Sequence, residues 1–355
     1  MEAVSVLFET LANKWLPTHW SLPETYVDLS GRTVIITGAS SGLGLEAAQW
    51  FYDMNPGKLI LAVRNLTKGE AAKEQIIDGD SKKGSGTQKV WASTEGRPDV
   101  EVWHLDMADF ASVKQFAKRC NTELERIDVF IANAAVCNGD WTVTKDHWEV
   151  NIQVNIISTF LLFLRIMPKA IETSKLPPPK CGVDLSPHMA IITSDTHYFA
   201  PFEDRDQPNI FAALNTKERY TVPHRYFKTK LMSVLLTRHL GKKLKFSREN
   251  TGVVFCTVNP GFCRSHIMDA TVSPLTLKIV FAIFGRATRE GAKTYTWATL
   301  NEEIPQGSYT SSCKVTVPSR LVCSAEGDRL SAKLWDELVA ILDEVDPENS
   351  HLWRD

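Results

Sequence analysis

A glycine-rich turn constrains the fold of this chain more than any other feature of its sequence. Residues 37–44 read Thr-Gly-Ala-Ser-Ser-Gly-Leu-Gly, between a β-branched run at residues 34–37 and a helix pattern at residues 43–53. A strand, a tight glycine turn and a helix in this order are typical of the loop that holds the phosphates of a dinucleotide. No Gly-Lys-Ser or Gly-Lys-Thr follows the turn, which disfavours a phosphate-loop NTPase.

The three glycines of the turn are expected to have separate roles. Gly38 allows the tight turn, Gly42 lets the backbone approach a pyrophosphate, and Gly44 lets the helix pack close to the sheet. The helix N-terminus adds unpaired N–H groups and the positive end of a dipole, which favour a phosphate. The candidate cofactor contacts in the turn are Gly38, Ser40, Ser41, Gly42, Leu43 and Gly44.

Strand-like and helix-like segments alternate along almost the whole chain. Six of the expected strands are at residues 34–37, 58–63, 100–105, 129–133, 189–194 and 253–258. Strands separated by helices form parallel βαβ units, and apolar runs without alternation suit strands that are covered on both faces. We therefore predict an α/β fold of Rossmann type, with a doubly wound, mainly parallel, seven-stranded sheet flanked by helices, as a single domain over residues 1–355.

Helix patterns fill the intervals between these strands, at residues 43–53, 66–77, 111–124, 145–170 and 224–244. Two stretches interrupt the rhythm and predict surface excursions. Residues 79–99 are rich in Gly, Ser, Lys and Thr, and residues 174–187 hold several prolines. Residues 1–30 carry apolar and aromatic side chains and are expected to pack as an N-terminal appendage.

The overall charge and the cysteines limit the classes of partner and compartment. With 40 basic and 42 acidic residues the net charge is -2, which gives no electrostatic reason to expect a nucleic acid or an anionic membrane as partner. The seven cysteines include no Cys-x-x-Cys pair, which favours reduced thiols in a cytoplasmic protein. We expect no signal peptide, no transmembrane segment of roughly 18 to 20 apolar residues and no metal site.

Further short motifs follow the glycine turn. They are, in order, Asp106 at the end of the third expected strand, Asn133-Ala134-Ala135 at the end of the fourth, Asn155 in the next helix, Ser194 at the end of the fifth strand, Tyr226 and Lys230 four residues apart, and Pro260-Gly261 with Ser265 after the sixth strand. Together with the spacing Gly-x-x-x-Gly-x-Gly, they resemble the short-chain dehydrogenase/reductase family, in its classical branch, over residues 29–342. Ala135 departs from the family's Asn-Ala-Gly.

The resemblance implies a catalytic set and a cofactor site. The implied catalytic residues are Asn155, Ser194, Tyr226 and Lys230. The implied cofactor contacts beyond the glycine turn are Arg64, Asp106, Met107, Asn133, Ala134, Tyr226, Lys230, Pro260, Gly261, Cys263 and Ser265. In the family, the residue at Asp106 contacts the adenine, the asparagine at Asn155 positions a water in a proton relay, and the lysine at Lys230 holds the nicotinamide ribose.

These residue types suit the interconversion of a carbonyl and an alcohol. A tyrosine has an ordinary pKa of about 10, so it is a poor acid/base at neutral pH unless its surroundings change that value. Lys230 lies one helical turn after Tyr226, where its charge is expected to lower the tyrosine pKa. Ser194 is expected to donate to the substrate oxygen as negative charge develops there. We therefore predict an oxidoreductase whose cofactor carries the hydride.

The residues after the second strand indicate which cofactor is used. NAD enzymes usually place an acidic residue there, on the 2′-hydroxyl of the ribose. In this chain the aligned position is Val63, and Arg64 follows. An arginine suits a 2′-phosphate through charge-assisted hydrogen bonds, so the sequence predicts NADP(H). The alternative is a solvated surface arginine.

Two inserts are expected to shape the substrate pocket. Residues 195–225 and residues 262–285, where the family has a mobile lid, are rich in aromatic and apolar side chains. They favour a fairly large, apolar or aromatic substrate, although the aromatics can equally serve to pack the inserts. His197 and His224 flank the site, and we interpret both as structural hydrogen-bonding residues, with a second acid/base as the alternative. The motifs look closest to retinol-dehydrogenase-like members and to fungal enzymes of secondary metabolism.

Two other functions stay open at this point. A catalytically silent NADP-binding regulator would use the same fold, although such proteins commonly lose the tyrosine or the lysine. An epimerase or dehydratase of the extended branch would favour a different glycine spacing and a longer C-terminal domain. Family members often dimerise through the fourth and fifth helices, so a homodimer is one expected state, which the appendages would oppose.

Overall fold

All strands of the described residues belong to one sheet. The computed structural model describes residues 21–82, 97–180, 183–263 and 285–354, and its eight strands lie in the order β3-β2-β1-β4-β5-β6-β7-β8. Neighbours pair in parallel from β3 through to β7, and β8 pairs antiparallel with β7. The predicted doubly wound parallel sheet is confirmed, with eight strands where seven were expected.

The elements follow the alternation expected from the sequence. The strands are β1 Thr33–Thr37, β2 Lys58–Val63, β3 Asp99–His104, β4 Val129–Ala132, β5 His188–Ile192, β6 Val254–Asn259, β7 Ser308–Ser311 and β8 Lys314–Val315. The longer helices are α2 Gly42–Tyr52, α3 Leu66–Lys82, α4 Phe110–Glu123, α6 Ser158–Ser174, α8 His224–Lys242, α11 Thr288–Thr299 and α13 Ala325–Val345. The short ones are α5 Val150–Ile152, the π-helix η3 Gln153–Ile157, η4 Asp195–Phe199, η5 Glu203–Asp206, α7 Ile210–Leu214, η6 Lys217–Arg219, η7 Leu244–Phe246, α9 Arg248–Thr251, α12 Arg320–Cys323 and η9 Pro347–Leu352.

The eighth strand follows β7 through a two-residue turn that could not be predicted from its sequence. Ser312 and Cys313 form the turn, and both have positive φ, at 50° and 56°. Hairpin turns of this kind usually carry Asn or Gly at these positions, because those residues tolerate positive φ most easily. The Ser-Cys pair therefore gives no hairpin pattern to recognise.

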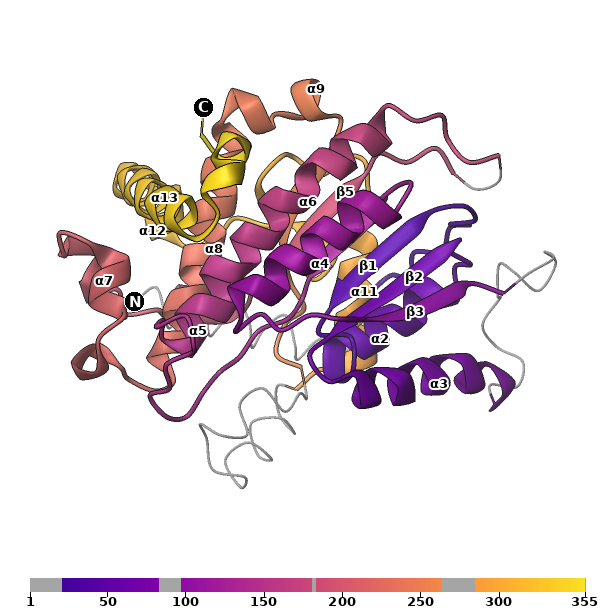
Figure 1. Ribbon diagram of the computed structural model, residues 1–355, viewed down its shortest axis with the longest axis horizontal. Coiled ribbons are helices and arrows are strands. Elements are labelled where there is room, and N and C mark those ends of the chain that lie inside the picture. Colours follow the sequence, from indigo (N-terminus) through magenta and orange to yellow (C-terminus); the bar gives the residue numbers. More distant parts are fainter. Residues whose placement is uncertain (1–20, 83–96, 181–182, 264–284, 355) are drawn as a thin grey trace.

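Both faces of the sheet are buried under helices. All residues of β1 are buried, and its alternate residues serve opposite faces: Ile35 packs with the side chains of α4, α6 and α8, whereas Val34 and Ile36 pack with those of α2 and α11. Figure 1 shows α4 and α6 on one side of the strands and α2, α3 and α11 on the other. Burial on both faces explains why the strands read as unbroken apolar runs.

The strand order reverses beside β1, and this reversal positions the site. From β1 the chain runs outward to β2 and β3, and it then returns to β4 on the other side of β1. The loops after β1 and β4 therefore leave the sheet in opposite directions and open a crevice at the carboxyl ends of the strands, where folds of this type bind nucleotides. Gly38 follows β1 there, and Asn133 follows β4.

Two segments differ from their predicted bounds, and one is described only in part. The helix expected at residues 145–170 begins at Val150 and contains the π-helical turn η3. The loop expected at residues 79–99 begins later, because α3 continues to Lys82, and residues 83–96 lie outside the described residues. Of the N-terminal appendage, residues 21–30 are described, and the Tyr26 ring packs edge-on against Trp50 with ring centroids 5.5 Å apart.

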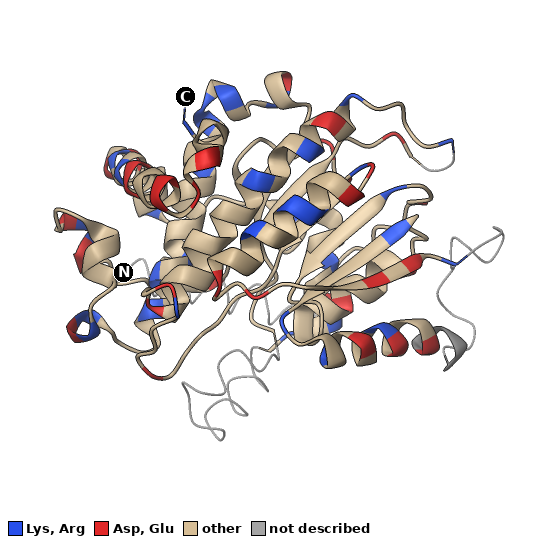
Figure 2. Cartoon of the chain, in the orientation of Figure 1, with Lys and Arg blue, Asp and Glu red and all other residues tan. Residues whose placement is uncertain are grey.

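One long apolar helical run belongs to the core of this fold. The run Val150–Ser174 is long and apolar enough to cross a membrane, but 89% of its most apolar window is buried inside the protein. Helix α13 packs against α8, and Lys114 on α4 donates to the carbonyl of Val345 at 2.8 Å. Figure 2 shows Lys and Arg interspersed with Asp and Glu along α3 and α13, in keeping with the net charge of -2.

Candidate active site

The backbone of the glycine turn has the conformation that the sequence predicted. Gly38 and Gly42 have positive φ, at 66° and 57°. A Cβ added at Gly42 would meet nothing within 4 Å, so this position faces open space, whereas a Cβ at Gly44 would lie 2.5 Å from the carbonyl oxygen of Gly38. Gly42 thus leaves a cradle open above the turn, and Gly44 allows the helix to pack closely beneath it.

Hydrogen bonds tie the glycine turn to the loop after β4. The Thr37 hydroxyl accepts from the backbone N–H groups of Asn133 and Ala134, at 3.0 and 2.9 Å. The Asn133 amide donates to the Thr37 carbonyl at 2.8 Å, and its oxygen accepts from the Tyr295 hydroxyl at 2.9 Å. The two walls of the crevice are therefore held together before any ligand binds. Tyr295, on α11, was not predicted from the sequence.

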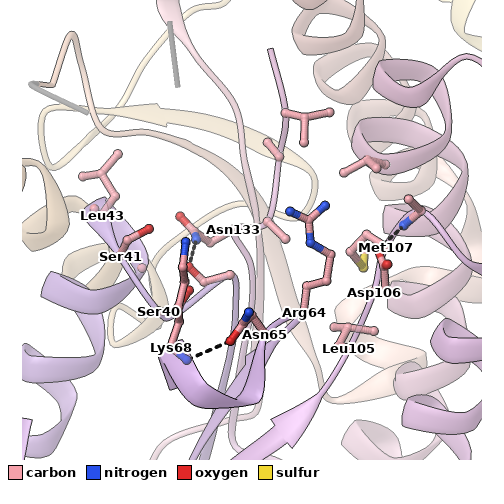
Figure 3. A pocket seen from close by; sticks show the side chains of 18 of the residues that line it. Ser40, Ser41, Leu43, Arg64, Asn65, Lys68, Leu105, Asp106, Met107 and Asn133 are labelled. Atoms are coloured by element: carbon pink, nitrogen blue, oxygen red, sulfur yellow. Dashed lines mark hydrogen bonds between the residues drawn. The ribbon is translucent and has the colours of Figure 1, made fainter. Parts of the chain in front are cut away.

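A cleft of about 550 Å³ opens between these two loops. It is lined by Gly38, Ser40, Ser41, Gly42, Leu43, Gly44, Arg64, Asn65, Lys68, Leu105, Asp106, Met107, Ala108, Asn133, Ala134, Ala135, Val136, Val150 and Val154. It thus brings together all the predicted contacts from the glycine turn with Arg64, Asp106, Met107, Asn133 and Ala134. Figure 3 shows Arg64 reaching into the cleft between the glycine turn and the end of β3.

The cleft suits a phosphorylated dinucleotide by its shape and its charge. The open cradle at Gly42 accepts a group that any side chain there would displace. Arg64 is exposed and forms no hydrogen bond or ion pair with the described residues, so its guanidinium is available to a ligand. Lys68, also exposed, adds a second cation to the lining. It lies in the first turn of α3, which begins two residues after Arg64.

A smaller cavity of about 90 Å³ adjoins the cleft and shares Leu43, Asn133 and Ala135 with it. Its lining brings together three of the predicted catalytic side chains and three predicted contacts after β6, namely Ser194, Tyr226, Lys230, Pro260, Gly261 and Cys263. Ser265 lies outside the described residues, as does most of the predicted lid. Asn155 does not line this cavity and contacts it indirectly, as described below.

Burial dominates the electrostatics of Tyr226 and Lys230. It raises the pKa of Tyr226 above its ordinary range, with a contribution from Cys137, and a hydrogen bond with Ser194 opposes the rise. Burial lowers the pKa of Lys230 to about 8. The Lys230 ammonium donates to the carbonyl of Ile192 at 2.8 Å and lies 5.4 Å from the centre of the Tyr226 ring. The expected lowering of the tyrosine pKa by the lysine is not found in this structure, where desolvation is the largest influence on the pKa of Tyr226.

His197 hydrogen-bonds to the backbone of Ser194 and is held in one tautomer. Its Nε2 accepts from the backbone N–H of Ser319 at 3.2 Å, so Nδ1 carries the proton and donates to the Ser194 carbonyl at 2.8 Å. Burial lowers the pKa of His197 to about 4, which keeps the ring neutral. Both ring nitrogens are engaged with backbone groups, in agreement with a structural role. His224 begins α8 and lines neither cavity.

Asn155 lies in the middle of the π-helical turn η3 and is almost completely buried. Its amide exchanges two hydrogen bonds with the backbone of Val136, both at 2.9 Å, and donates a third to the Thr229 hydroxyl at 3.0 Å. The side chain thus connects the loop after β4 to helix α8. Single π-helical turns are rare and occur frequently at functional sites, but they leave no clear trace in the hydrophobic pattern of a sequence.

Comparison with known proteins also finds similarity to short chain dehydrogenases along most of the chain. Residues 32–175 match the family described as short chain dehydrogenase. The short chain dehydrogenase/reductase dmxR8 of Cryptosporiopsis sp. is 34% identical over 92% of this chain and 95% of its own length. The short chain dehydrogenase atnD of Emericella nidulans is 33% identical over 81% of this chain and 86% of its own.

Solved structures share the fold at lower identity. A protein of Mycobacterium paratuberculosis superposes with a TM-score of 0.62 at 23% identity, over 91% of this chain and 95% of its own. Levodione reductase superposes with a TM-score of 0.56 at 16% identity, over 79% and 95% of the two chains.

Substitution of the two glycines should separate ligand binding from folding. Gly42→Val puts a branched side chain into the open cradle and should abolish NADPH binding, while the backbone strain lowers the free energy of unfolding by only about 1 to 3 kcal/mol. Gly44→Ala forces its Cβ against the Gly38 carbonyl and should mainly lower the melting temperature. Isothermal titration and thermal unfolding of both variants check this. Unchanged NADPH affinity in Gly42→Val would show that the turn does not hold the cofactor.

The buried lysine should leave a signature in the pH dependence of stability. Because burial lowers the pKa of Lys230 from 10.5 to about 8, the unfolded chain holds a proton between these values that the folded protein has lost. The free energy of unfolding should therefore rise with pH in that window, by at most about 3 kcal/mol from this group. Urea unfolding should show a flatter pH dependence for Lys230→Met than for the wild type. The exposed Lys314→Met serves as control, and a wild-type slope in Lys230→Met contradicts the prediction.

Proposed function

Because this chain belongs to the short-chain dehydrogenase/reductase family, we propose that it is an NADP(H)-dependent oxidoreductase that interconverts a ketone or aldehyde and the corresponding alcohol. The observation that carries the proposal is the meeting of Ser194, Tyr226 and Lys230 in one cavity that adjoins the glycine-turn cleft. A cofactor in the cleft would end beside these three side chains, where a carbonyl group can approach them.

The proposed chemistry divides the work between the cofactor and the protein. A bound nicotinamide supplies or accepts the hydride. Tyr226 donates its hydroxyl proton to the carbonyl oxygen in reduction and takes it back in oxidation. Burial raises the pKa of Tyr226, so the residue is protonated at neutral pH, as reduction requires, but is a weaker acid than an exposed tyrosine. Ser194 donates a hydrogen bond to the same oxygen as negative charge develops on it.

The proposed preference for NADP(H) rests on the charges at the cleft. Arg64 has no partner among the described residues, and Lys68 lines the cleft nearby. Two cations beside each other suit the 2′-phosphate that distinguishes NADP from NAD. The aligned acidic position that would favour NAD is occupied by Val63, which is buried.

The proposed substrate is a fairly large apolar or aromatic molecule, in fungal secondary metabolism. The relatives dmxR8 and atnD are both fungal proteins. In the insert at residues 195–225, Phe202 and Phe211 are buried in the hydrophobic core, whereas Phe199 is exposed and Tyr220 is half-buried. We also propose a cytoplasmic location, in keeping with the absence of disulfides among the six described cysteines. We propose that a homodimer would form through a surface other than the face of α8 that contacts α13, because α13 covers that face.

Cofactor preference gives the first test. NADPH should bind at least about tenfold more tightly than NADH, and Arg64→Ala should remove most of the difference, because a charge-assisted hydrogen bond contributes about 1.5 to 3 kcal/mol. Arg329→Ala, at an exposed position on α13, is the matched control and should retain the preference. Fluorescence titration of both cofactors measures the two dissociation constants. Equal constants in the wild type would rule out a selective 2′-phosphate site.

Removal of the tyrosine hydroxyl tests the acid/base role. Tyr226→Phe should lower the single-turnover rate of carbonyl reduction by about 10² to 10⁴-fold with NADPH binding retained, since that is the usual contribution of general acid/base catalysis. The rate is measured by stopped-flow NADPH oxidation over a panel of aliphatic and aromatic carbonyls that includes phenanthrenequinone. Tyr26→Phe, which removes a hydroxyl that lines neither cavity, should keep the full rate. A Tyr226→Phe protein with the wild-type rate would place the acid/base elsewhere.

A further inference from the structure

The hydroxyl of Thr229 joins the helix that carries Tyr226 to the turn that carries Asn155. Thr229 stands three residues after Tyr226 on α8 and is fully buried. Its hydroxyl donates to the Tyr226 carbonyl at 2.7 Å and accepts from the Asn155 amide at 3.0 Å. Both hydrogen-bonding functions of the hydroxyl are therefore used, one on each element.

The other end of the Asn155 side chain is anchored to the cofactor cleft. Its oxygen accepts from the Val136 N–H, and its amide donates to the Val136 carbonyl, both at 2.9 Å. Val136 lines the cleft, and the next residue, Cys137, interacts electrostatically with both Tyr226 and Lys230. A continuous chain of hydrogen bonds thus runs from the cleft wall through Asn155 and Thr229 to the backbone of Tyr226.

Three side-chain hydrogen bonds fix the position of Asn155. The residue lies within η3, and single π-helical turns of this kind are rare and occur frequently at functional sites. Two of its three side-chain bonds go to Val136 on the loop, and the third goes to Thr229 on α8. Loss of the Thr229 hydroxyl would leave a buried Asn155 N–H without its partner, so the turn would move relative to α8.

We propose that Thr229 is a positioning residue, whose hydroxyl sets the placement of Tyr226 relative to Asn155 and the cofactor cleft. The inference rests on the proposed function, because it concerns the proton transfer by Tyr226. It predicts that the hydroxyl matters and that the methyl group of Thr229 does not. A residue that only filled space would show the opposite order.

Two near-isosteric variants make the test. Thr229→Val replaces the hydroxyl by a methyl group and should lower the single-turnover rate of phenanthrenequinone reduction by about ten- to a hundredfold, the usual result of a small misplacement in an active site. The NADPH dissociation constant should not change. Thr229→Ser retains the hydroxyl and should keep a near-wild-type rate. Full activity in the valine variant, or a larger loss in the serine variant than in the valine variant, overturns the inference.

A double-mutant cycle tests whether Thr229 acts through Asn155. In an Asn155→Ala background, Thr229→Val should have little further effect on the rate, and the two substitutions should be non-additive in urea unfolding, a readout that needs no substrate. Additive effects in both measurements overturn the inference. If Thr229→Val does not fold, Thr229→Ala is judged against the serine variant by the same criteria.

Tyr226→Phe, measured in the same series, distinguishes a failure of the proposed function from a failure of the role inferred for Thr229. A wild-type rate in Tyr226→Phe, or a wild-type protein that does not reduce the probe, contradicts the proposed function and with it this inference. A slow Tyr226→Phe beside a fully active Thr229→Val contradicts the inference alone.

Discussion

The hydrogen bonds between Thr37 and the loop after β4 are the constraint on which the site depends. The strand order reverses between β1 and β4, and such a reversal leaves two loops facing each other across a crevice. The hydroxyl and carbonyl of Thr37 engage the backbone and the side chain of Asn133, so the glycine turn on one side and the cleft wall on the other are built as one unit. Tyr295 reaches the same asparagine from α11 and links the second face of the sheet to it.

The side chains proposed to react lie in the smaller cavity beside the same crevice. Tyr226 and Lys230 project from α8 into a cavity that shares its wall with the cofactor cleft, and both are nearly inaccessible to water. Desolvation raises the tyrosine pKa and lowers the lysine pKa, so each group is biased toward its neutral form before a ligand arrives. Before a ligand binds, Tyr226 is therefore protonated and a weaker acid than an exposed tyrosine.

The sequence predicted those parts of the fold and site that depend on local pattern. The strand, glycine turn and helix around Gly42 are contiguous in the sequence, so periodicity and turn chemistry suffice to find them. Tyr226 and Lys230 lie one helical turn apart, and they were identified by the resemblance of the ordered motifs to the family. Tyr295 was not predicted because it lies 162 residues from Asn133 in the sequence, and only the packing of α11 brings the two side chains into contact. The π-helical turn at Asn155 and the Ser-Cys hairpin escaped for a different reason, since neither uses the residues that usually mark such geometry.

Transfer of deuterium from the cofactor to the product tests the central claim most directly. In the proposed mechanism, the cleft and the cavity together bring a nicotinamide to a carbonyl carbon beside Tyr226. NADPH deuterated at the transferring position of the nicotinamide should therefore yield, with a carbonyl that the protein reduces, an alcohol that carries one deuterium on the former carbonyl carbon, as read by mass spectrometry and NMR. NADPH that binds in the cleft but gives no deuterated alcohol from any carbonyl of the panel would contradict the account.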